Sequence, residues 1–240
     1  MRVLVTGAAG QIGSDFARGA SDEMQLTLTD RSAAAGSDTS PAVTALDITD
    51  ADACRAAVDG VDAVLHLAAD PAPDADFLSS VLPVNMLGTY NMITAACDAR
   101  THRFVFASSA HAVSGYPLEY QVRESDAARP ANDYGVGKAF GEALCASWAV
   151  RSMTTFVAIR IGNYQQETPA AEASLQDRMA WISPRDAGQL LGLCLTAAID
   201  DYRVAHGVSN NTPKRLALRQ TRAVFGYHPY DDAFGAHPLR

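Results

Sequence analysis

The stretch MRVLVTGAAGQIG, residues 1–13, decides the fold that we expect for this chain. Its β-branched beginning, residues 1–6, predicts a strand buried in a parallel sheet. The glycines that follow allow a tight turn, a close approach of the backbone to a diphosphate, and close packing of a helix on the strand. That helix, expected over residues 11–20, would point its first amides at the phosphates. Because the glycines lie between a strand and a helix, we predict a dinucleotide site rather than an ordinary glycine-rich turn. Its residues on this stretch are Gly7, Gly10, Gln11, Ile12 and Gly13.

An acidic residue ends the second predicted strand, residues 24–30. Asp30 comes 17 residues after Gly13, close to the spacing of about 20 at which such sites place the acid that binds ribose. A carboxylate accepts hydrogen bonds from both ribose hydroxyls and repels a 2′-phosphate, so we predict NAD as the cofactor. Arg31 follows at once and leaves NADP as the alternative, because an arginine can hold that phosphate.

Strand-like and helix-like segments alternate along the rest of the chain, which predicts an α/β fold. We expect a doubly wound parallel sheet (a Rossmann fold) with helices on both faces and a small C-terminal substrate-binding portion. Further strands are expected over residues 43–46, 61–67, 102–107, 154–161 and 203–208, and helices over residues 50–59, 77–99, 132–151 and 184–198. Loops are expected over residues 31–41 and 115–130, and a further helix after residue 214.

The length of 240 residues predicts a single domain. We expect the NAD-binding core over about residues 1–162 and small substrate-binding or cap elements over about residues 163–240. The fourth strand ends at Leu67 and is followed by Ala68 and Ala69, whose small side chains let the backbone lie against the cofactor.

The composition argues against several classes of partner. The net charge is −8 and the isoelectric point is about 5.1, so a nucleic-acid partner is not expected. No apolar run is long enough to span a bilayer, and because the sequence opens with a predicted strand we expect no signal peptide. The four cysteines form no C-x-x-C pair, and no H-x-x-x-H or H-E-x-x-H pattern occurs. We therefore expect reduced cysteines, no metal site, and a cytoplasmic protein with a small-molecule substrate.

Tyr134 and Lys138, in the segment YGVGK, are spaced to share one face of a helix. A free tyrosine titrates near pH ~10, and a nearby lysine ammonium favours the phenolate and lowers that pKa. We therefore expect Tyr134 to act as a general base on an alcohol. Ser109 lies 25 residues upstream, after the fifth predicted strand. Its alternative role is a serine turn that ends this strand.

These motifs together resemble the extended short-chain dehydrogenase/reductase superfamily of sugar epimerases, dehydratases and dehydrogenases. The glycine loop, Asp30, HLAA (66–69), NMLGTYN (85–91), ASSAHAV (107–113) and YGVGK (134–138) occur in the order and spacing of that superfamily. The resemblance implies that Ser109 is the catalytic serine and that Asn85 supports the site and its proton-relay water. It also implies that Asp47 and Ile48 contact the adenine.

Within the superfamily the chain is most similar to uronate dehydrogenases, in LVTGAAGQIG (4–13), ARPANDYGVGKAFGE (128–142) and DRMAWIS (177–183). The resemblance implies that Arg178 grips a sugar carboxylate, for which a guanidinium is suited, and that His111 hydrogen-bonds the sugar. The short C-terminal portion suggests a small substrate. Three features depart from that family: Ala110 replaces its asparagine, DPAP (70–73) lacks its serine, and the loop RIGNYQQETPA (160–170) differs. A surface salt bridge is the alternative role for Arg178.

The reaction that we expect is the NAD-dependent oxidation of a hexuronate, such as glucuronate or galacturonate, at its anomeric carbon to an aldarolactone. Tyr134 would remove the hydroxyl proton, Ser109 would stabilise the charge on that oxygen, and Lys138 would hold the ribose and lower the pKa of Tyr134. Another NAD(P)-linked dehydrogenase, reductase or epimerase reaction is the first alternative, because the fold does not discriminate them. A non-catalytic dinucleotide sensor is the second. Relatives pair through the helices at residues 77–99 and 132–151, so a homodimer or higher oligomer is expected.

Overall fold

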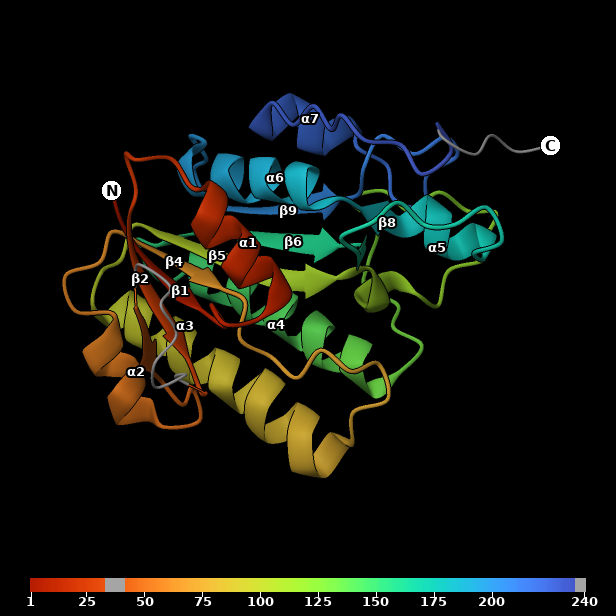
Figure 1. The fold of residues 1–240 in the computed structure, drawn as a ribbon. Helices are drawn as coiled ribbons and strands as arrows, with labels where there is room; N and C mark the ends of the chain where they lie inside the picture. Colours follow the sequence, from red (N-terminus) through yellow and green to blue (C-terminus); the bar gives the residue numbers. More distant parts are fainter. Residues whose placement is uncertain (33–41, 236–240) are drawn as a thin grey trace.

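A parallel β-sheet forms the centre of the molecule (Figure 1). The computed structural model describes residues 1–32 and 42–235, and within them seven parallel strands follow the order β3-β2-β1-β4-β5-β6-β9. The chain begins in the middle of the sheet, winds to one edge and then to the other, which confirms the predicted doubly wound fold. The strands are β1 (Arg2–Thr6), β2 (Gln25–Asp30), β3 (Val43–Ala45), β4 (Ala63–His66), β5 (Arg103–Ser109), β6 (Thr155–Ile161) and β9 (Tyr202–Gly207).

Helices cover both faces of this sheet (Figure 1). On one face lie α1 (Gln11–Gly19) and α6 (Pro184–Thr196), and on the other lie α2 (Ala51–Ala57), α3 (Thr89–Asp98) and α4 (Asp133–Ala149). Phe16 and Leu190 pack on the first face, and Met92 and Cys145 on the second. Burying a large apolar side chain completely stabilises the fold by about 1.5–3 kcal/mol. The central strands face helices on both sides, which explains why their sequences are almost continuously apolar.

The helix expected over residues 77–99 is divided into two segments. The first, η1 (Phe77–Gly88), is wound as a π-helix, and α3 continues it from Thr89. Pro83 lies inside η1, and a proline lacks the N–H for an α-helical hydrogen bond and clashes with the carbonyl four residues earlier. Asp76 caps this segment by accepting a hydrogen bond from the Ser79 amide. Pro83 therefore accounts locally for the wider winding, which the hydrophobic periodicity of the sequence does not predict.

The carboxyl ends of the strands carry the irregular parts of the chain. β5 extends two residues further than expected, so that Ser109 ends the strand and then caps the short 3₁₀ helix η2 (Ala110–Val113). The expected loop over residues 115–130 follows it, and Asn132 caps α4. α5 (Leu175–Ala180) and the two-stranded sheet of β7 (Asn163–Tyr164) and β8 (Trp181–Ile182) lie at the same edge.

The range expected to hold cap elements also contributes to the core. β9 pairs with β6, and α6 packs against α1, while α7 (Arg219–Phe225) lies outside α6 (Figure 1). The boundary at about residue 163 stays a prediction. Asp50 caps α2, since its carboxylate accepts hydrogen bonds from the amides of Asp52 and Ala53. The loop expected over residues 31–41 lies, from residue 33 on, outside the described residues. None of the helices described is long and apolar enough to cross a membrane.

Candidate active site

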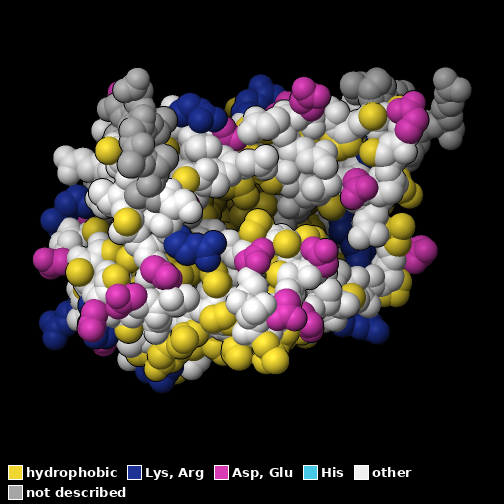
Figure 2. Space-filling view, turned by 60° about the horizontal axis from the view of Figure 1, so that its bottom comes forward, with side chains coloured by type: hydrophobic (Ala, Val, Ile, Leu, Met, Phe, Trp, Pro, Cys, Tyr) yellow, Lys and Arg dark blue, Asp and Glu magenta, His cyan; other side chains and the backbone are white. Residues whose placement is uncertain are grey.

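A cavity of about 1060 Å³ lies along the carboxyl ends of the strands. Figure 2 shows a hollow near the centre of this side of the molecule, with hydrophobic side chains at its bottom. Every predicted cofactor residue lines the cavity: Gly7, Gly10, Gln11, Ile12, Gly13, Asp30, Asp47, Ile48, Leu67, Ala68, Ala69, Tyr134 and Lys138. Ser109 and His111 line it as well, whereas Asn85 and Arg178 do not.

The glycine loop leaves room for a dinucleotide at the start of α1. Gly7 has a φ of 73°, and a Cβ there would lie 2.6 Å from the amide nitrogen of Ala68. A Cβ on Gly13 would lie 2.5 Å from the carbonyl oxygen of Gly7. Both positions thus require glycine, and the backbone amides at the beginning of the helix face an open cavity. This arrangement fits a diphosphate.

Acidic side chains occupy the end of the cavity at β2 and β3. The Asp30 carboxylate accepts hydrogen bonds from the amides of Ala9 and Ser32, each at 3.1 Å. Asp47 accepts from the amide and the hydroxyl of Thr49 at 2.9 and 2.8 Å, and these bonds hold its pKa below the usual range. Ile48 packs so closely on Gly88 that a Cβ there would lie 2.6 Å from the isoleucine side chain. The acids and the buried isoleucine suit a ribose and an adenine.

Ser109, Tyr134 and Lys138 meet at the ends of β5 and α4. The Lys138 ammonium donates to the Ala107 carbonyl at 2.7 Å and lies 5.6 Å from the centroid of the Tyr134 ring. Burial lowers the pKa of Lys138 to about 8. Burial also raises the pKa of Tyr134, and a hydrogen bond with Ser109 only partly opposes this rise. Desolvation of the buried phenol is thus the largest effect on this pKa, and the lowering by Lys138 stays a prediction.

The orientation of His111 is set by Asn132, a residue that the sequence reasoning did not single out. The Asn132 side-chain oxygen accepts from the Gly135 amide at 2.8 Å, so its amide nitrogen must be the group 3.0 Å from Nδ1 of His111. Nδ1 therefore accepts, and the neutral ring carries its proton on Nε2. Burial keeps the ring neutral by lowering the pKa of His111. The ring lies edge-on to Tyr134 at 5.5 Å between centroids, and Nε2 is the hydrogen-bond donor of this ring.

The Ser109 hydroxyl is fixed in a similar way. Its oxygen accepts a hydrogen bond from the His111 amide at 3.1 Å, which leaves the hydroxyl proton for an acceptor in the cavity.

Asn85 acts on the cavity wall through the backbone of Asp70. Its side chain accepts from the Asp70 amide at 2.8 Å and donates to the Asp70 carbonyl at 3.0 Å. Asp70 itself lines the cavity, together with Ser80, whose hydroxyl donates to the Asp70 carboxylate. A serine therefore lies beside DPAP although that segment contains none.

A buried histidine connects this wall to β1. His66 Nδ1 lies 2.8 Å from the Thr6 hydroxyl, and Nε2 lies 3.2 Å from the Thr89 hydroxyl, which donates to the Asn85 carbonyl. Because the Thr89 hydroxyl donates to Asn85, Nε2 of His66 must donate to the Thr89 oxygen. Burial, with a smaller contribution from Lys138, lowers the pKa of His66 to about 3. His66 thus has a structural role in this arrangement, because both of its ring nitrogens bond to threonine hydroxyls.

Two arginines lie near the part of the cavity formed by α5. Arg178 is buried, with its guanidinium carbon 4.2 Å from the centroid of the Phe234 ring and one N–H donated to the Ala233 carbonyl at 3.2 Å. Its neighbours Gln176, Asp177 and Ala180 line the cavity. Arg215 lines it directly, and its guanidinium donates to the carbonyls of Tyr116, Pro117 and Tyr120 at 2.6–2.7 Å. No local pattern marks Arg215, since those partners lie about a hundred residues earlier in the sequence.

In the part of the chain that the structure describes, no group of three or more His, Cys, Asp or Glu side chains could hold a metal ion. The four cysteines are free thiols, and three of them are buried.

Comparisons with known proteins agree with this geometry. The sequence profile of the NAD dependent epimerase/dehydratase family matches residues 3–173. The chain is 38% identical to the NAD-dependent glucose-6-phosphate dehydrogenase of Haloferax volcanii, over 99% of this chain and 97% of that protein. It is 34% identical to the L-arabinose 1-dehydrogenase (NAD(P)(+)) of the same organism, over 97% of each. A crystal structure of a variant uronate dehydrogenase from Agrobacterium tumefaciens, complexed with NAD, superposes with a TM-score of 0.87 at 29% identity, covering 98% of this chain and 88% of that one.

The family match covers most of the chain, and these relatives match nearly all of it. The glycine loop, the acid at the end of β2 and the cavity between them accommodate the cofactor that the family name specifies. The predictions of NAD as cofactor, of an oxidoreductase, and of similarity to uronate dehydrogenases are confirmed. The chain therefore belongs to the NAD dependent epimerase/dehydratase family and is an NAD-dependent oxidoreductase.

Proposed function

We propose that this protein is a sugar dehydrogenase that oxidises a small anionic aldose at its anomeric carbon. The first candidate substrate is a hexuronate such as glucuronate or galacturonate. The observation that carries the proposal is the convergence of Ser109, Tyr134 and His111, a ring that donates through Nε2, at one cavity, next to buried Lys138. A general base, an oxygen-stabilising hydroxyl and a sugar-binding donor are thereby brought together.

NAD, when bound, supplies the acceptor for the hydride that leaves the anomeric carbon. The glycine loop would hold its diphosphate, Asp30 its adenosine ribose, and Asp47 and Ile48 its adenine. Leu67, Ala68 and Ala69 would lie against it at the end of β4. Lys138 would hold the other ribose, since its ammonium is buried beside Tyr134 and bonded to Ala107.

In the reaction, Tyr134 would take the proton of the anomeric hydroxyl while Ser109 donates a hydrogen bond to the same oxygen. Because burial raises the pKa of Tyr134, proton removal by this residue should become easier as the pH rises. Asn85 would support the site from outside the cavity, by holding Asp70 in place.

The substrate's anionic group would be recognised at α5. Arg178 remains our candidate for the carboxylate, and His111 for a sugar hydroxyl. A hexose 6-phosphate is the second candidate substrate, for two reasons. The glucose-6-phosphate dehydrogenase relative has the higher identity to this chain, and Arg215 is a buried arginine that, unlike Arg178, lines the cavity itself. A sensor without activity would not need the serine, tyrosine and lysine together.

Steady-state NADH formation with four sugars tests the substrate class. We expect kcat/KM for glucuronate, galacturonate or glucose 6-phosphate to exceed that for arabinose, which carries no anionic group. Preference for arabinose would contradict recognition of an anion. Saturable NAD binding without turnover of any of the four would favour the sensor.

We also propose that the chain forms a homodimer through η1 and α4. Leu78, Leu82 and Leu87 of η1 and Val136 of α4 are exposed, and hydrophobic side chains gather along the lower edge of Figure 2. Gly137 and Gly141 of α4 do not form part of this surface, because they face Val81 and Phe106 of the same chain. Light scattering should give twice the monomer mass, and Leu78→Glu with Leu82→Glu should give the monomer mass.

A further inference from the structure

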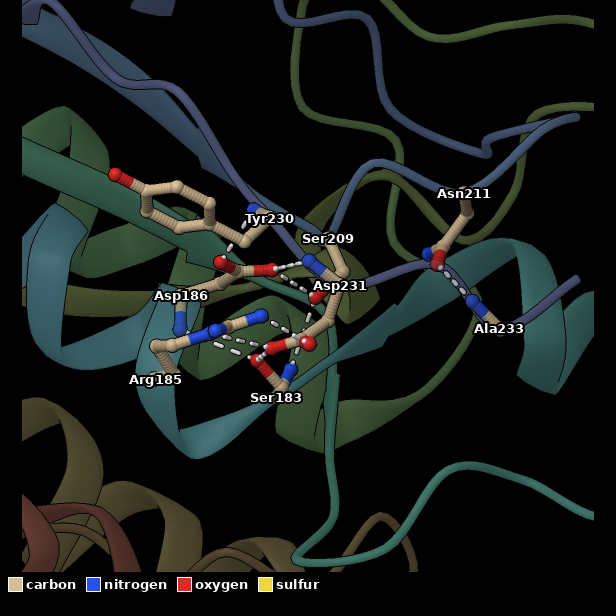
Figure 3. Close-up of polar contacts among 8 residues, drawn as sticks. All are labelled: Ser183, Arg185, Asp186, Ser209, Asn211, Tyr230, Asp231 and Ala233. Carbon is tan, nitrogen blue, oxygen red and sulfur yellow. Dashed lines mark hydrogen bonds and ion pairs between the residues drawn. The ribbon is translucent and has the colours of Figure 1, made fainter. Parts of the chain in front are cut away.

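A carboxylate outside the cavity is completely buried and has no part in the proposed chemistry. Asp186 lies in the first turn of α6 and is 0% exposed. One of its oxygens accepts from the Tyr230 amide at 2.7 Å, and the other accepts from the Asp231 amide at 3.0 Å and from the Ser209 hydroxyl at 2.6 Å (Figure 3). A carboxylate is tolerated inside a protein only when such bonds replace its hydration. Two of the three donors belong to the backbone of the C-terminal segment.

Further contacts fix the same segment, residues 230–234, which we call the C-terminal strap. The Asp231 carboxylate accepts from the Ser183 hydroxyl at 2.5 Å and pairs with Arg185 at 2.6 Å. The Ala233 amide donates to the side-chain oxygen of Asn211 at 3.0 Å, and the Asn211 amide nitrogen donates to the Trp181 carbonyl at 2.8 Å. The strap is therefore tied to Ser183, between β8 and α6, to the start of α6 and to the loop after β9 (Figure 3).

The far end of the strap lies against α5. Met179, Trp181, Ala233 and Phe234 form an apolar cluster. The Ala233 carbonyl accepts from Arg178, and the Phe234 ring lies against the Arg178 guanidinium. On its other side, α5 presents Gln176, Asp177 and Ala180 to the cavity. The strap is thus the connection between buried Asp186 and the cavity wall formed by α5.

We propose that Asp186 is a positioning residue for substrate binding, because it anchors the strap that fixes α5 and orients Arg178. The proposal rests on the proposed function in one respect, that α5 forms the substrate end of the cavity. Asp186 contacts neither the cavity nor the cofactor residues, so its effect reaches the substrate only through the strap.

The variant Asp186→Asn tests the anchor with little change of shape. An amide presents an NH₂ where one carboxylate oxygen accepted, so at least one backbone N–H of the strap loses its acceptor. We expect faster hydrogen exchange in residues 230–234 and in α5. We also expect a substrate KM higher by about tenfold to a hundredfold, as a displaced binding group produces. The dissociation constant of NAD should stay unchanged. Asp200→Asn, which removes the charge of an exposed residue, is the matched control.

Phe234→Ala provides a second route to the same effect. It removes the contact with Arg178 and leaves Asp186 in place, so it should raise the substrate KM on its own. Because both changes act through the strap, the double variant should show a KM increase well below the product of the single effects. This variant keeps the proposal testable even if Asp186→Asn fails to fold.

Hydrogen exchange that stays slow in the strap of Asp186→Asn would overturn the proposal. Faster exchange in the strap, with unchanged exchange in α5 and an unchanged substrate KM, would overturn it as well. Multiplicative effects in the double variant would do the same. The exchange measurement does not depend on turnover. A wild type inactive on all sugars with exchange as expected would therefore refute the proposed function and leave the strap's control of α5 intact.

Discussion

The buried ion pair between Glu142 and Arg160 should hold α4 to the sheet below the proposed catalytic residues. Glu142 follows Tyr134 and Lys138 at intervals of four residues and shares their face of α4. Arg160 of β6 donates to the two Glu142 oxygens at 3.0 and 2.9 Å. The Ser108 hydroxyl donates to the same carboxylate at 2.6 Å. Both charged side chains are less than a tenth exposed.

Replacing one member of this pair should lower the free energy of unfolding far more than replacing both. Glu142→Leu leaves the guanidinium with one bond, to the Asp126 carbonyl at 3.1 Å, and its Nη1 already has no partner among the described residues. Breaking a buried pair in this way costs about 3–5 kcal/mol, out of a total stability of about 5–15 kcal/mol. Arg160→Met should cost a similar amount, because it leaves the carboxylate with the Ser108 hydroxyl alone.

The double variant Glu142→Leu with Arg160→Met leaves no buried charge. It deprives the Ser108 hydroxyl and the Asp126 carbonyl of partners, at about 1 kcal/mol each. Its free energy of unfolding should therefore fall by about 2–3 kcal/mol, whereas the sum of the two single losses is about 6–10 kcal/mol. Urea unfolding, followed by the fluorescence of Trp148 and Trp181, measures all four proteins. Losses that add in the double variant would refute the reasoning, because the two groups would then not be interacting.

Three further predictions concern the glycine loop, buried histidine and His111. Gly7→Ala should abolish NAD binding and lower the free energy of unfolding by about 1–2 kcal/mol from its positive φ alone. Gly188→Ala, whose Cβ would meet nothing within 4 Å, should raise that free energy by about 0.5–1 kcal/mol. Calorimetry measures NAD binding and urea unfolding measures stability. Equal NAD binding and equal stability in the two variants would contradict this prediction. Below pH ~6.5 His66 is protonated in the unfolded chain, but in the folded protein, where its pKa is about 3, it stays neutral. Stability should therefore fall by about 1.4 kcal/mol per pH unit for this residue as the pH is lowered towards 5. Urea unfolding of His66→Gln should show a shallower slope, and an unchanged slope would exclude this origin. Asn132→Ala should lower the melting temperature through loss of a helix cap worth about 1 kcal/mol and raise the substrate KM by releasing the His111 ring. A lower melting temperature with the same KM would show that Asn132 only caps the helix.

Local signals made the cofactor half of the site predictable. The strand, the glycines and the helix at residues 1–20 are adjacent in sequence, and Asp30 follows at a spacing that the fold itself imposes. Tyr134 and Lys138 are one helical turn apart, so their proximity also follows from the sequence. The position of Ser109 could be predicted because it ends β5, a strand that packs against α4.

The substrate half was less accessible because it depends on long-range contacts. Arg215 reaches the cavity by binding carbonyls of a loop about a hundred residues earlier, and Asp186 holds amides 44 and 45 residues later. No periodicity encodes such pairs. The direction of the Tyr134 pKa could not be predicted either, since it depends on how deeply tertiary packing buries the phenol.

The most direct test of the account compares NADH formation by the wild type and by Tyr134→Phe, on the sugar acid or phosphate that the wild type oxidises best. The account predicts a loss of kcat by about 10²–10⁴-fold, the usual contribution of a general base, far larger than any change in the dissociation constant for NAD. It also predicts that wild-type kcat rises with pH above neutrality, because burial raises the pKa of the base. A Tyr134→Phe variant that keeps the wild-type kcat and pH profile would contradict the assignment of Tyr134 as the base.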